Sequence, residues 1–217
     1  MNKLKKIFFN NAFLRKILNF LSFNSIDKGI SFDNKGIIRK SIVKQKKKNN
    51  NNVLVVDAES YLSNVIIRFF GSNNTIRIGR NTCIKDSQIL VFDNNNSILI
   101  GNNTNLNEKV KIVVLEGGNI SIGDHCLISY DVEIRNGDSH SLLMEGQRIN
   151  YCKNVQICNH VWIGERSLVL KGAQINDNCV VGASSIVTSH IFPSHTLIVG
   201  CPAKVVKNNI DWDHQRL

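Results

Sequence analysis

Histidine and cysteine are the side chains with the most reactive chemistry in this 217-residue chain, and there are six of each. His140 ends the segment 135–140 (RNGDSH) and lies in an irregular stretch, 138–154, of an otherwise repetitive sequence. We expect its side chain to project from the body of the protein, where an imidazole can accept a proton near neutral pH. His140 is therefore the candidate general base, and the alternative is a histidine that only makes a loop hydrogen bond.

Carboxylates near His140 have several candidate roles. Three roles are open for Asp138: orienting His140, contacting an acceptor substrate, and capping the turn. Asp131 and Glu145 are weaker candidates for orienting the imidazole. Four other histidines fall at turns of the repeat or beside Pro193, and we interpret them as structural: His125, His160, His190 and His195.

The cysteines show no C-x-x-C pair and no zinc-like spacing, so we expect free thiols in a reducing cytoplasm and no metal. No apolar run approaches the roughly 18–20 residues of a membrane span, and no signal peptide is visible. We expect Cys126 and Cys179 to be packing residues, because both occupy small corner slots of the repeating units.

The elements that must hold these residues repeat with a 22-residue period between about 50 and 137. Each unit places aliphatic residues in the same slots, such as Leu54, Ile76, Ile98 and Ile120, or Leu62, Ile84, Leu106 and Ile128. Fixed self-similarity of this length is typical of solenoids. The Asn-rich stretches are expected to supply turns, since Asn tolerates left-handed backbone geometry.

From residue 155 onward the period tightens to six, in the series Ile157, Ile163, Val169, Ile175, Val181 and Val187. An α-helix cannot place every sixth residue on one face, because six steps of 100° end 120° from a full turn. A six-residue rung with one inward aliphatic residue instead builds a triangular coil that closes after eighteen residues. We therefore predict an all-β solenoid over 51–192, with about seven coils whose strands pair in parallel.

The C-terminal third carries a family pattern. Segments 161–164 (VWIG), 181–187 (VGASSIV) and 200–206 (GCPAKVV) closely resemble the hexapeptide-repeat acyltransferases. The resemblance covers about 50–206 and implies a left-handed parallel β-helix, a homotrimer with active sites between subunits, and acetyl-CoA as co-substrate. Within the family, the sugar O-acetyltransferases of capsule and exopolysaccharide pathways look nearest, and the loop after RNGDSH resembles that of the capsular polysialic acid O-acetyltransferases.

Acyl transfer from a thioester to a hydroxyl needs a base, hydrogen-bond donors for the oxyanion, and a surface that holds both substrates together. His140 would be the base. The resemblance places Trp162 at the family's site-lining tryptophan position, beside the acetyl group and the pantetheine arm; the alternative is an exposed aromatic residue on the coil. Arg135 and Asp138 are the expected acceptor contacts.

The resemblance also implies which residues bind CoA. Backbone groups at 165 and 183, one 18-residue coil apart, would meet the pantetheine, and two lysines would meet phosphates, to which an ammonium group is suited. The sequence has Gly-Cys-Pro at 200–202, where the family often has Gly-Asn-Pro, and Ala-Ser-Ser in place of Ala-Gly-Ser at 183–185. The implied CoA-binding residues are Trp162, Glu165, Ala183, Ser184, Pro202, Ala203, Lys204 and Lys207.

The formal net charge of +10 is unevenly distributed. Residues 1–50 hold 13 Lys and Arg against 2 Asp and Glu, whereas the rest of the chain is almost neutral. We predict a basic N-terminal appendage, 1–50, with an amphipathic helix over 3–23, and a C-terminal tail, 193–217, that contributes to CoA binding. Three roles are open for the appendage: packing on the main domain, contacting anionic lipid at the inner face of the membrane, and recruiting a polyanionic substrate or partner. No nucleic-acid-binding motif accompanies the charge.

The sequence thus predicts an acetyl-CoA-dependent O-acetyltransferase that acts on a sugar hydroxyl of a bacterial capsular or other surface glycan, glycans with sialic acid included. Three alternatives stay open. One is N-acetylation of a nucleotide-linked amino sugar, for which His140 would also serve as base. The others are a carbonic-anhydrase-like metal β-helix, which would need three histidine ligands, and a non-catalytic β-helix that only binds.

Overall fold

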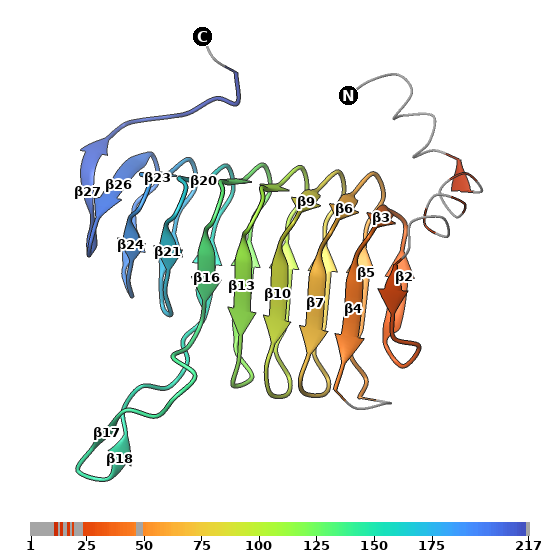
Figure 1. Cartoon of the computed structure of the whole chain (residues 1–217). Coiled ribbons are helices and arrows are strands. Elements are labelled where there is room, and N and C mark those ends of the chain that lie inside the picture. Colours follow the sequence, from red (N-terminus) through yellow and green to blue (C-terminus); the bar gives the residue numbers. More distant parts are fainter. Residues whose placement is uncertain are drawn as a thin grey trace.

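The computed structural model describes residues 24–46 and 50–215, together with Asn11, Ala12, Leu14, Ile17 and Asn19. Every element with defined bounds in this part is a strand, and three parallel sheets run along the molecule (Figure 1). The chain visits the first, second and third sheets in turn and then returns to the first. The protein is therefore a β-solenoid of about seven turns, as the repeat predicts.

The neighbouring strands of each sheet come from successive coils. In spatial order, the first sheet contains β1 (Ser25–Ile26), β4 (Ile42–Gln45), β7 (Ile66–Phe69), β10 (Gln88–Val91), β13 (Lys111–Val114), β16 (Glu133–Arg135), β21 (Leu168–Val169) and β24 (Ile186–Val187). The second contains β2 (Ser31–Asn34), β5 (Val53–Val56), β8 (Thr75–Ile78), β11 (Ser97–Ile100), β14 (Asn119–Ile122), β19 (Val155–Ile157), β22 (Gln174–Ile175) and β25 (Ile191–Phe192). The third contains β3 (Ile37–Arg39), β6 (Tyr61–Ser63), β9 (Cys83–Lys85), β12 (Asn105–Leu106), β15 (Leu127–Ile128), β20 (Trp162–Ile163), β23 (Val180–Val181), β26 (Thr196–Gly200) and β27 (Ala203–Asn208). A separate hairpin is formed by β17 (Leu143–Met144) and β18 (Gln147–Arg148).

The strand register confirms both predicted periods. Thr75 pairs with Ser97, which is a 22-residue step, and Gln156 pairs with Gln174, which is an 18-residue step. Across the loop 138–154, Leu127 pairs with Trp162 at a longer, 35-residue step, because this loop is inserted into a single coil. The side chains of successive coils therefore stand in columns, each spaced by about one strand separation of 4.8 Å.

The extra residues of the 22-residue coils lie in two places. The strands of the first two sheets have four residues there, as in β7 and β8, but two in the later coils, as in β21 and β22. The Asn-rich turn between these sheets has five residues in one coil, 70–74, against four in a later coil, 170–173. The loop 138–154 replaces this turn at the same corner, and its β17–β18 hairpin projects away from the solenoid (Figure 1).

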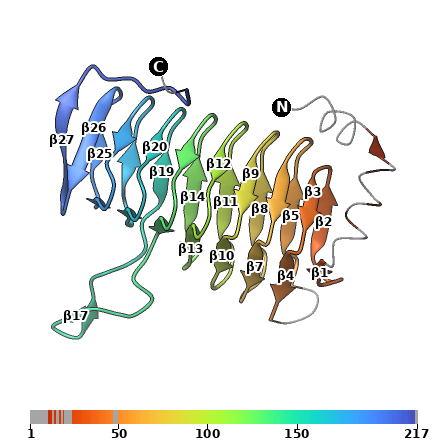
Figure 2. The same cartoon turned by 45° about the horizontal axis from the view of Figure 1, so that its top comes forward.

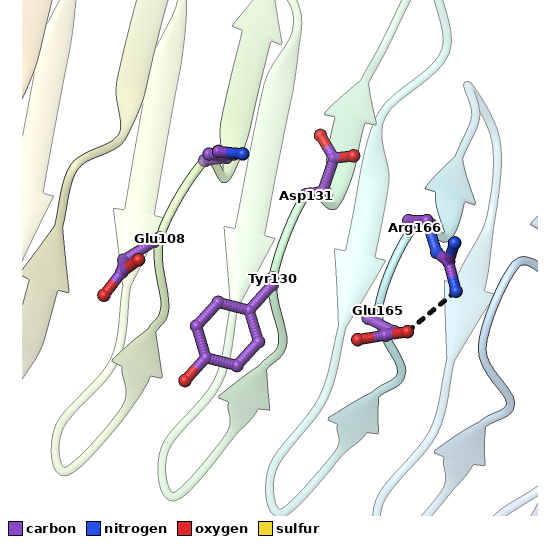
Figure 3. Close-up of a pocket in the computed structure, with 6 residues that line it drawn as sticks. Glu108, Tyr130, Asp131, Glu165 and Arg166 are labelled. Carbon is purple, nitrogen blue, oxygen red and sulfur yellow. Dashed lines mark hydrogen bonds and ion pairs between the residues drawn. The ribbon is translucent and has the colours of Figure 1, made fainter.

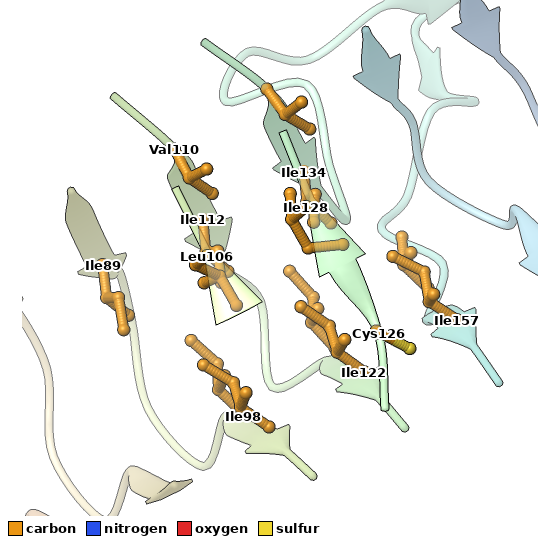
Figure 4. Close-up of a cluster of buried hydrophobic side chains, with 14 of the residues drawn as sticks. Ile89, Ile98, Leu106, Val110, Ile112, Ile122, Cys126, Ile128, Ile134 and Ile157 are labelled. Atoms are coloured by element: carbon orange, nitrogen blue, oxygen red, sulfur yellow. The ribbon is translucent and has the colours of Figure 1, made fainter. Parts of the chain in front are cut away.

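Aliphatic side chains fill the interior in stacked columns. Leu106 lies beside Ile128 in the next coil of the third sheet, and Ile112 lies beside Ile134 in the first sheet (Figure 4). All four are at most 1% exposed. Burial of one such side chain contributes about 1.5–3 kcal/mol, so the columns are the main source of stability.

The cysteines that we placed in corner slots are buried. All six cysteines lie in the described residues, and none of them forms a disulfide there. Burial raises the pKa of Cys126 to about 12, and its Sγ donates a hydrogen bond to the backbone oxygen of Cys158 at 3.1 Å. Cys179 Sγ donates in the same way to the oxygen of Pro193 at 3.0 Å. These contacts support a packing role, because a protonated buried thiol is a poor nucleophile.

A ladder of buried asparagines closes the corner between the first and second sheets. Asn74 Nδ2 donates to Asn52 Oδ1 at 3.1 Å and to the backbone oxygen of Asp93 at 3.0 Å. Asn74 Oδ1 in turn accepts the backbone N–H of Asn96 at 2.8 Å. Each side chain thereby satisfies backbone groups that the turn leaves without a strand partner.

A second column lies at the corner between the second and third sheets. Its residues all have positive φ, which Asn and His adopt more readily than most L-residues. The histidines that we interpreted as structural at turns include His125, His160 and His195, and all three fall in this column. The column consists of Asn81, Asn103, His125, His160, Asn178 and His195.

The solenoid begins upstream of the boundary that we predicted at residue 51. Strands β1 to β4 pair with later strands, for example Phe32 with Leu54, so residues 25–45 are part of the coils and are not a separate appendage. The predicted helix over 3–23 falls largely outside the described residues and stays a prediction. Asn19 is described, and its Oδ1 accepts the backbone N–H of Ile38 at 2.8 Å.

In the described part of the chain, no helix has the length and apolar character needed to cross a membrane.

Replacing Asn74 with alanine should lower the free energy of unfolding by about 2 kcal/mol or more, because buried groups on both neighbouring coils lose their partner. Urea denaturation measures this. Asn119→Ala is the matched control, since Asn119 is exposed and its side chain accepts a hydrogen bond from Ser97 Oγ at 2.7 Å on the surface. Equal effects of the two substitutions would show that the ladder adds nothing beyond an ordinary surface contact.

Candidate active site

A groove runs along the outer face of the third sheet, and we call it the tryptophan groove. It encloses about 380 Å³. Three of the residues predicted to meet the acyl donor, Trp162, Glu165 and Ala183, line it together. The full lining is Ser129, Tyr130, Trp162, Gly164, Glu165, Val180, Val181, Gly182 and Ala183.

Trp162 is positioned by its strand and by one hydrogen bond. On β20 it pairs with Leu127 on one side and Val180 on the other. Its indole Nε1 donates to Ser129 Oγ at 3.0 Å, and 38% of the residue remains exposed. The ring is therefore held at a fixed angle with one part open to the groove, as a site-lining aromatic residue requires.

Backbone groups of two coils meet at the floor of the groove. The backbone N–H of Ser184 donates to the oxygen of Glu165 at 2.8 Å, which aligns residues 165 and 183 as predicted. Ser184 itself is exposed at the corner with a φ of 56° and does not line the groove. A Cβ at Gly164 would lie 2.6 Å from the backbone nitrogen of Ala183, so only glycine allows the two coils to approach this closely.

The hairpin of β26 and β27 continues the same outer face toward the C-terminal end. A lateral line runs from Trp162 through Val180 and Leu197 to Lys207, one residue on each of four neighbouring strands. Strand spacing puts the ends of this line about 14 Å apart. Lys204 and Lys207 are exposed on β27, whereas Ala203 is buried at 7% exposure. Pro202 follows a cis peptide bond at the hairpin turn.

His140 lies in the inserted loop, and its residue is exposed. Asn150 holds this part of the loop, because its Nδ2 donates to the backbone oxygen of His140 at 2.7 Å and to Asp138 Oδ2 at 2.8 Å. Lys171 Nζ forms an ion pair with the same carboxylate. The segment that carries His140 is thereby tied to the solenoid.

The contacts of Asp138 point to its role. Partial burial alone would raise the pKa of Asp138, but hydrogen bonds from Lys171 and Asn150, with the charges of Lys171 and Arg135, lower it overall. Its hydrogen bonds therefore anchor the loop, and among the described residues none joins its carboxylate to the His140 ring.

The other residues that we predicted near His140 have different positions. Arg135 donates from Nε to the backbone oxygen of Gly137 at 2.8 Å and from NH2 to Ser139 Oγ at 2.9 Å, so its guanidinium braces the start of the loop. Glu145 is exposed at the turn of the β17–β18 hairpin. Asp131 lies at another corner, between the third and first sheets.

His140 and the tryptophan groove lie on different parts of the triangular coil. The loop of His140 leaves from the corner between the first and second sheets, whereas the groove lies on the third sheet and reaches its corner with the first. The single chain thus brings Trp162, Glu165 and Ala183 together in one groove but does not bring His140 to them.

Trp212, in the C-terminal tail, is a residue that the repeat could not reveal. Its ring stacks on His160 with 4.5 Å between centroids and lies 6.0 Å from the ring of Trp162. Its Nε1 donates to the backbone oxygen of His160 at 2.8 Å. Figure 2 shows the tail running back from β27 over the coils. Trp212 therefore supports Trp162 without lining the groove.

Comparisons with known proteins show what this chain is similar to. The family described as "Bacterial transferase hexapeptide (six repeats)" matches residues 154–189, which include Trp162, Glu165 and Ala183 of the groove. A polysialic acid O-acetyltransferase of Escherichia coli O1:K1 / APEC is 34% identical over 40% of this chain and 29% of its own length. The enzyme of the same name from Neisseria meningitidis is 35% identical over 40% of this chain and 41% of its own.

A solved structure of the polySia-specific acetyltransferase NeuO has a TM-score of 0.77 and 28% identity, and the match covers 87% of this chain and 91% of that one. Residues 154–189 thus match the hexapeptide transferase repeat, and the chain as a whole is similar in fold to NeuO. The chain's matches span less than half of the two curated relatives. The hexapeptide pattern accounts for the six-residue rungs that hold Trp162, Glu165 and Ala183 in register.

Removing the Trp212 ring should leave Trp162 more exposed to water. The chain has two tryptophans, so Trp212→Ala and Trp212→Phe both leave Trp162 as the sole emitter. Phenylalanine can keep the ring contact, whereas alanine cannot. We expect red-shifted emission and stronger acrylamide quenching for the alanine variant than for the phenylalanine variant. Identical spectra would mean that Trp212 does not support Trp162.

Acid should release the loop of His140. The pKa of Asp138 is lowered in the folded protein. The stabilisation that its ion pair with Lys171 gives to the loop is therefore fully present above the ordinary Asp pKa of about 3.9, and it is lost as the pH falls through the lower pKa of the folded state. At pH values under about 4, the protection of residues 139–151 from hydrogen exchange, corrected for the intrinsic rate, should therefore decrease. Lys171→Met should reproduce the loss at pH 7, and unchanged protection in that variant would exclude the anchor.

Proposed function

We propose that this protein transfers an acetyl group from acetyl-CoA to a sugar hydroxyl of a bacterial capsular or other surface glycan. The observation that carries the proposal is the tryptophan groove, where Trp162, Glu165 and Ala183 converge within the segment that matches the hexapeptide transferases. Two relatives are named polysialic acid O-acetyltransferases, so sialic acid-containing glycans are among the acceptors to test.

The residues of the third sheet fit the donor by their chemistry. An apolar groove with one indole wall suits the acyl end and the pantetheine arm. The exposed ammonium groups of Lys204 and Lys207, on the same face, suit phosphates. Exposed Pro202 at the hairpin turn suits the adenine, whereas the side chain of the neighbouring Ala203 is buried and leaves only its backbone for such a contact. Acetyl-CoA, when bound, supplies the acetyl group as a thioester. No metal is part of the proposal.

His140 takes the proton from the attacking hydroxyl as the new C–O bond forms. The thioester C–S bond then breaks, the acetyl group stays on the acceptor oxygen, and CoA leaves as a thiol with the proton returned by His140. The anchored loop supports this role: Asp138 and Asn150 fix the backbone of the loop, so the exposed imidazole is presented from a defined position. Asp138 is therefore a positioning residue in this proposal, and Arg135 acts on the same loop. Positioning both substrates lowers the entropic part of the barrier.

The active unit is a homotrimer of left-handed coils with sites between subunits. The observation in support is that His140 and the tryptophan groove lie on different parts of the coil, so His140 of one subunit would serve the groove of the next. A second copy of the chain completes the site.

His140→Ala should lower turnover about 100-fold or more, because general-base assistance is lost, while the Kd for CoA stays within about twofold. Acetyl transfer to a panel of neutral and sialylated glycans is followed by mass spectrometry and by thiol release. His190→Ala is the matched control, since His190 is also exposed but packs its ring edge against Phe192. Near-normal turnover of the His140 variant would reject the base, and acetylation of amino groups alone would reject O-acetylation.

A further inference from the structure

A second hollow adjoins the tryptophan groove at the corner between the third and first sheets, and we call it the corner hollow. It encloses about 340 Å³ and shares Tyr130 and Glu165 with the groove (Figure 3). No motif of the sequence marks it, although Asp131 and Glu165 are candidate site residues for other reasons. Its lining is Glu108, Lys109, Tyr130, Asp131, Glu165 and Arg166.

Three successive coils build the corner hollow with little freedom. The backbone N–H of Asp131 donates to the oxygen of Glu108 at 3.1 Å, and that of Arg166 donates to the oxygen of Tyr130 at 2.9 Å. These bonds stack Glu108, Tyr130 and Glu165 one above another at the coil spacing of about 4.8 Å. Figure 3 shows the three side chains on the same side of the ribbon.

The stacked residues offer the groups that a sugar ring uses. Tyr130 is 50% exposed and presents a ring with a hydroxyl at its end, between the carboxylates of Glu108 and Glu165. An aromatic face packs against the C–H groups of a pyranose, and carboxylates accept hydrogen bonds from its hydroxyls. The hollow therefore has one apolar surface and several acceptors at fixed spacing, which is the pattern of a small-molecule subsite.

The charge of the corner hollow selects among sugars. Three carboxylates, those of Glu108, Asp131 and Glu165, face two cations. Arg166 is already paired with Glu165 at 2.9 Å, which leaves Lys109 as the other cation of the lining beside Glu108 and Asp131. A sugar that carries its own carboxylate would be repelled, whereas the hydroxyls of an uncharged sugar would find acceptors.

We propose that the corner hollow is the acceptor-binding site and that it binds an uncharged sugar ring. This inference rests on the proposed function. It also gives the site a direction: β27 and its lysines lie at one end, the tryptophan groove follows, and the corner hollow lies beyond Tyr130 toward the earlier coils. The acceptor hydroxyl thus reaches the acyl end of the donor from the side opposite the hairpin.

Steady-state kinetics with two matched acceptors tests the proposal. A neutral galacto-oligosaccharide and an oligosialic acid of the same length are compared at saturating acetyl-CoA. The wild-type protein should have the higher kcat/KM with the neutral acceptor. Glu108→Gln keeps the size of the side chain but removes its charge, and it should raise the KM for the neutral acceptor about tenfold, with the KM for acetyl-CoA within about twofold.

Asp86→Asn is the matched control, because it also neutralises a carboxylate, one coil earlier in the column of Glu108. The backbone N–H of Lys109 donates to the oxygen of Asp86 at 2.9 Å, and Asp86 does not line the hollow. The double variant Glu108→Gln/Asp131→Asn should raise kcat/KM for the oligosialic acid about tenfold relative to the neutral acceptor. Circular dichroism spectra that match the wild type establish that the variants fold.

The outcomes separate the two proposals. One contrary result is that the wild-type protein acetylates sugar hydroxyls while Glu108→Gln leaves the acceptor KM unchanged, and another is that the oligosialic acid is the better acceptor. Either result overturns the proposed acceptor-binding site in the corner hollow and leaves the proposed function standing. If the wild-type protein acetylates no sugar hydroxyl of either acceptor or of the wider glycan panel, both the proposed function and the proposed acceptor-binding site are overturned.

Discussion

Hydrogen bonds between the parallel strands of successive coils fix where every side chain of the solenoid stands. Because each strand pairs with the strand one coil away, residues 22 or 18 positions apart share one column and one orientation. The outer face therefore acts as a grid. Trp162 lies in one column, and Glu108, Tyr130 and Glu165 lie in another. A slip in strand register would shift these residues relative to one another, whereas extra residues at a corner, such as the loop 138–154, leave the columns aligned.

The protein tolerates insertion at one corner, and the insertion needs its own supports. The loop 138–154 leaves the ladder between β16 and β19, so strand pairing cannot hold it. Side chains do so instead: Lys171 and Asn150 bind Asp138, and Arg135 bridges the backbone oxygen of Gly137 and the hydroxyl of Ser139. The residue proposed as the base thus depends on polar contacts, whereas the donor groove depends on the coil itself.

The periodic part of the molecule could be predicted because each coil repeats the same packing problem. The 22-residue slots of Leu62 and Ile84 and the 18-residue step from Glu165 to Ala183 both follow from the pattern of aliphatic and small residues. The first coil escaped prediction because Asn34 stands where Val56 stands in the next coil, and because Val43 pairs with Ile67 at a 24-residue step, outside the regular period.

Contacts outside the repeat could not be predicted in the same way. Lys171 and Asp138 are 33 residues apart and belong to a coil and a loop that share no period. Trp212 follows the last strand, and nothing in its neighbours indicates that the tail turns back toward His160. The corner hollow was missed because its residues alternate in charge and carry no motif, although all of them lie at the same turn of successive coils.

The antiparallel strand β27 has a consequence for the whole particle. A stack of parallel coils ends in an unpaired strand, on which another solenoid could add and continue without limit. In the third sheet that end is closed by β27, which runs against the direction of the coils and lies at the edge. Its exposed lysines, Lys204 and Lys207, add charge to the edge. The strand proposed to receive the phosphates of the donor thereby also caps the third sheet against the addition of another solenoid.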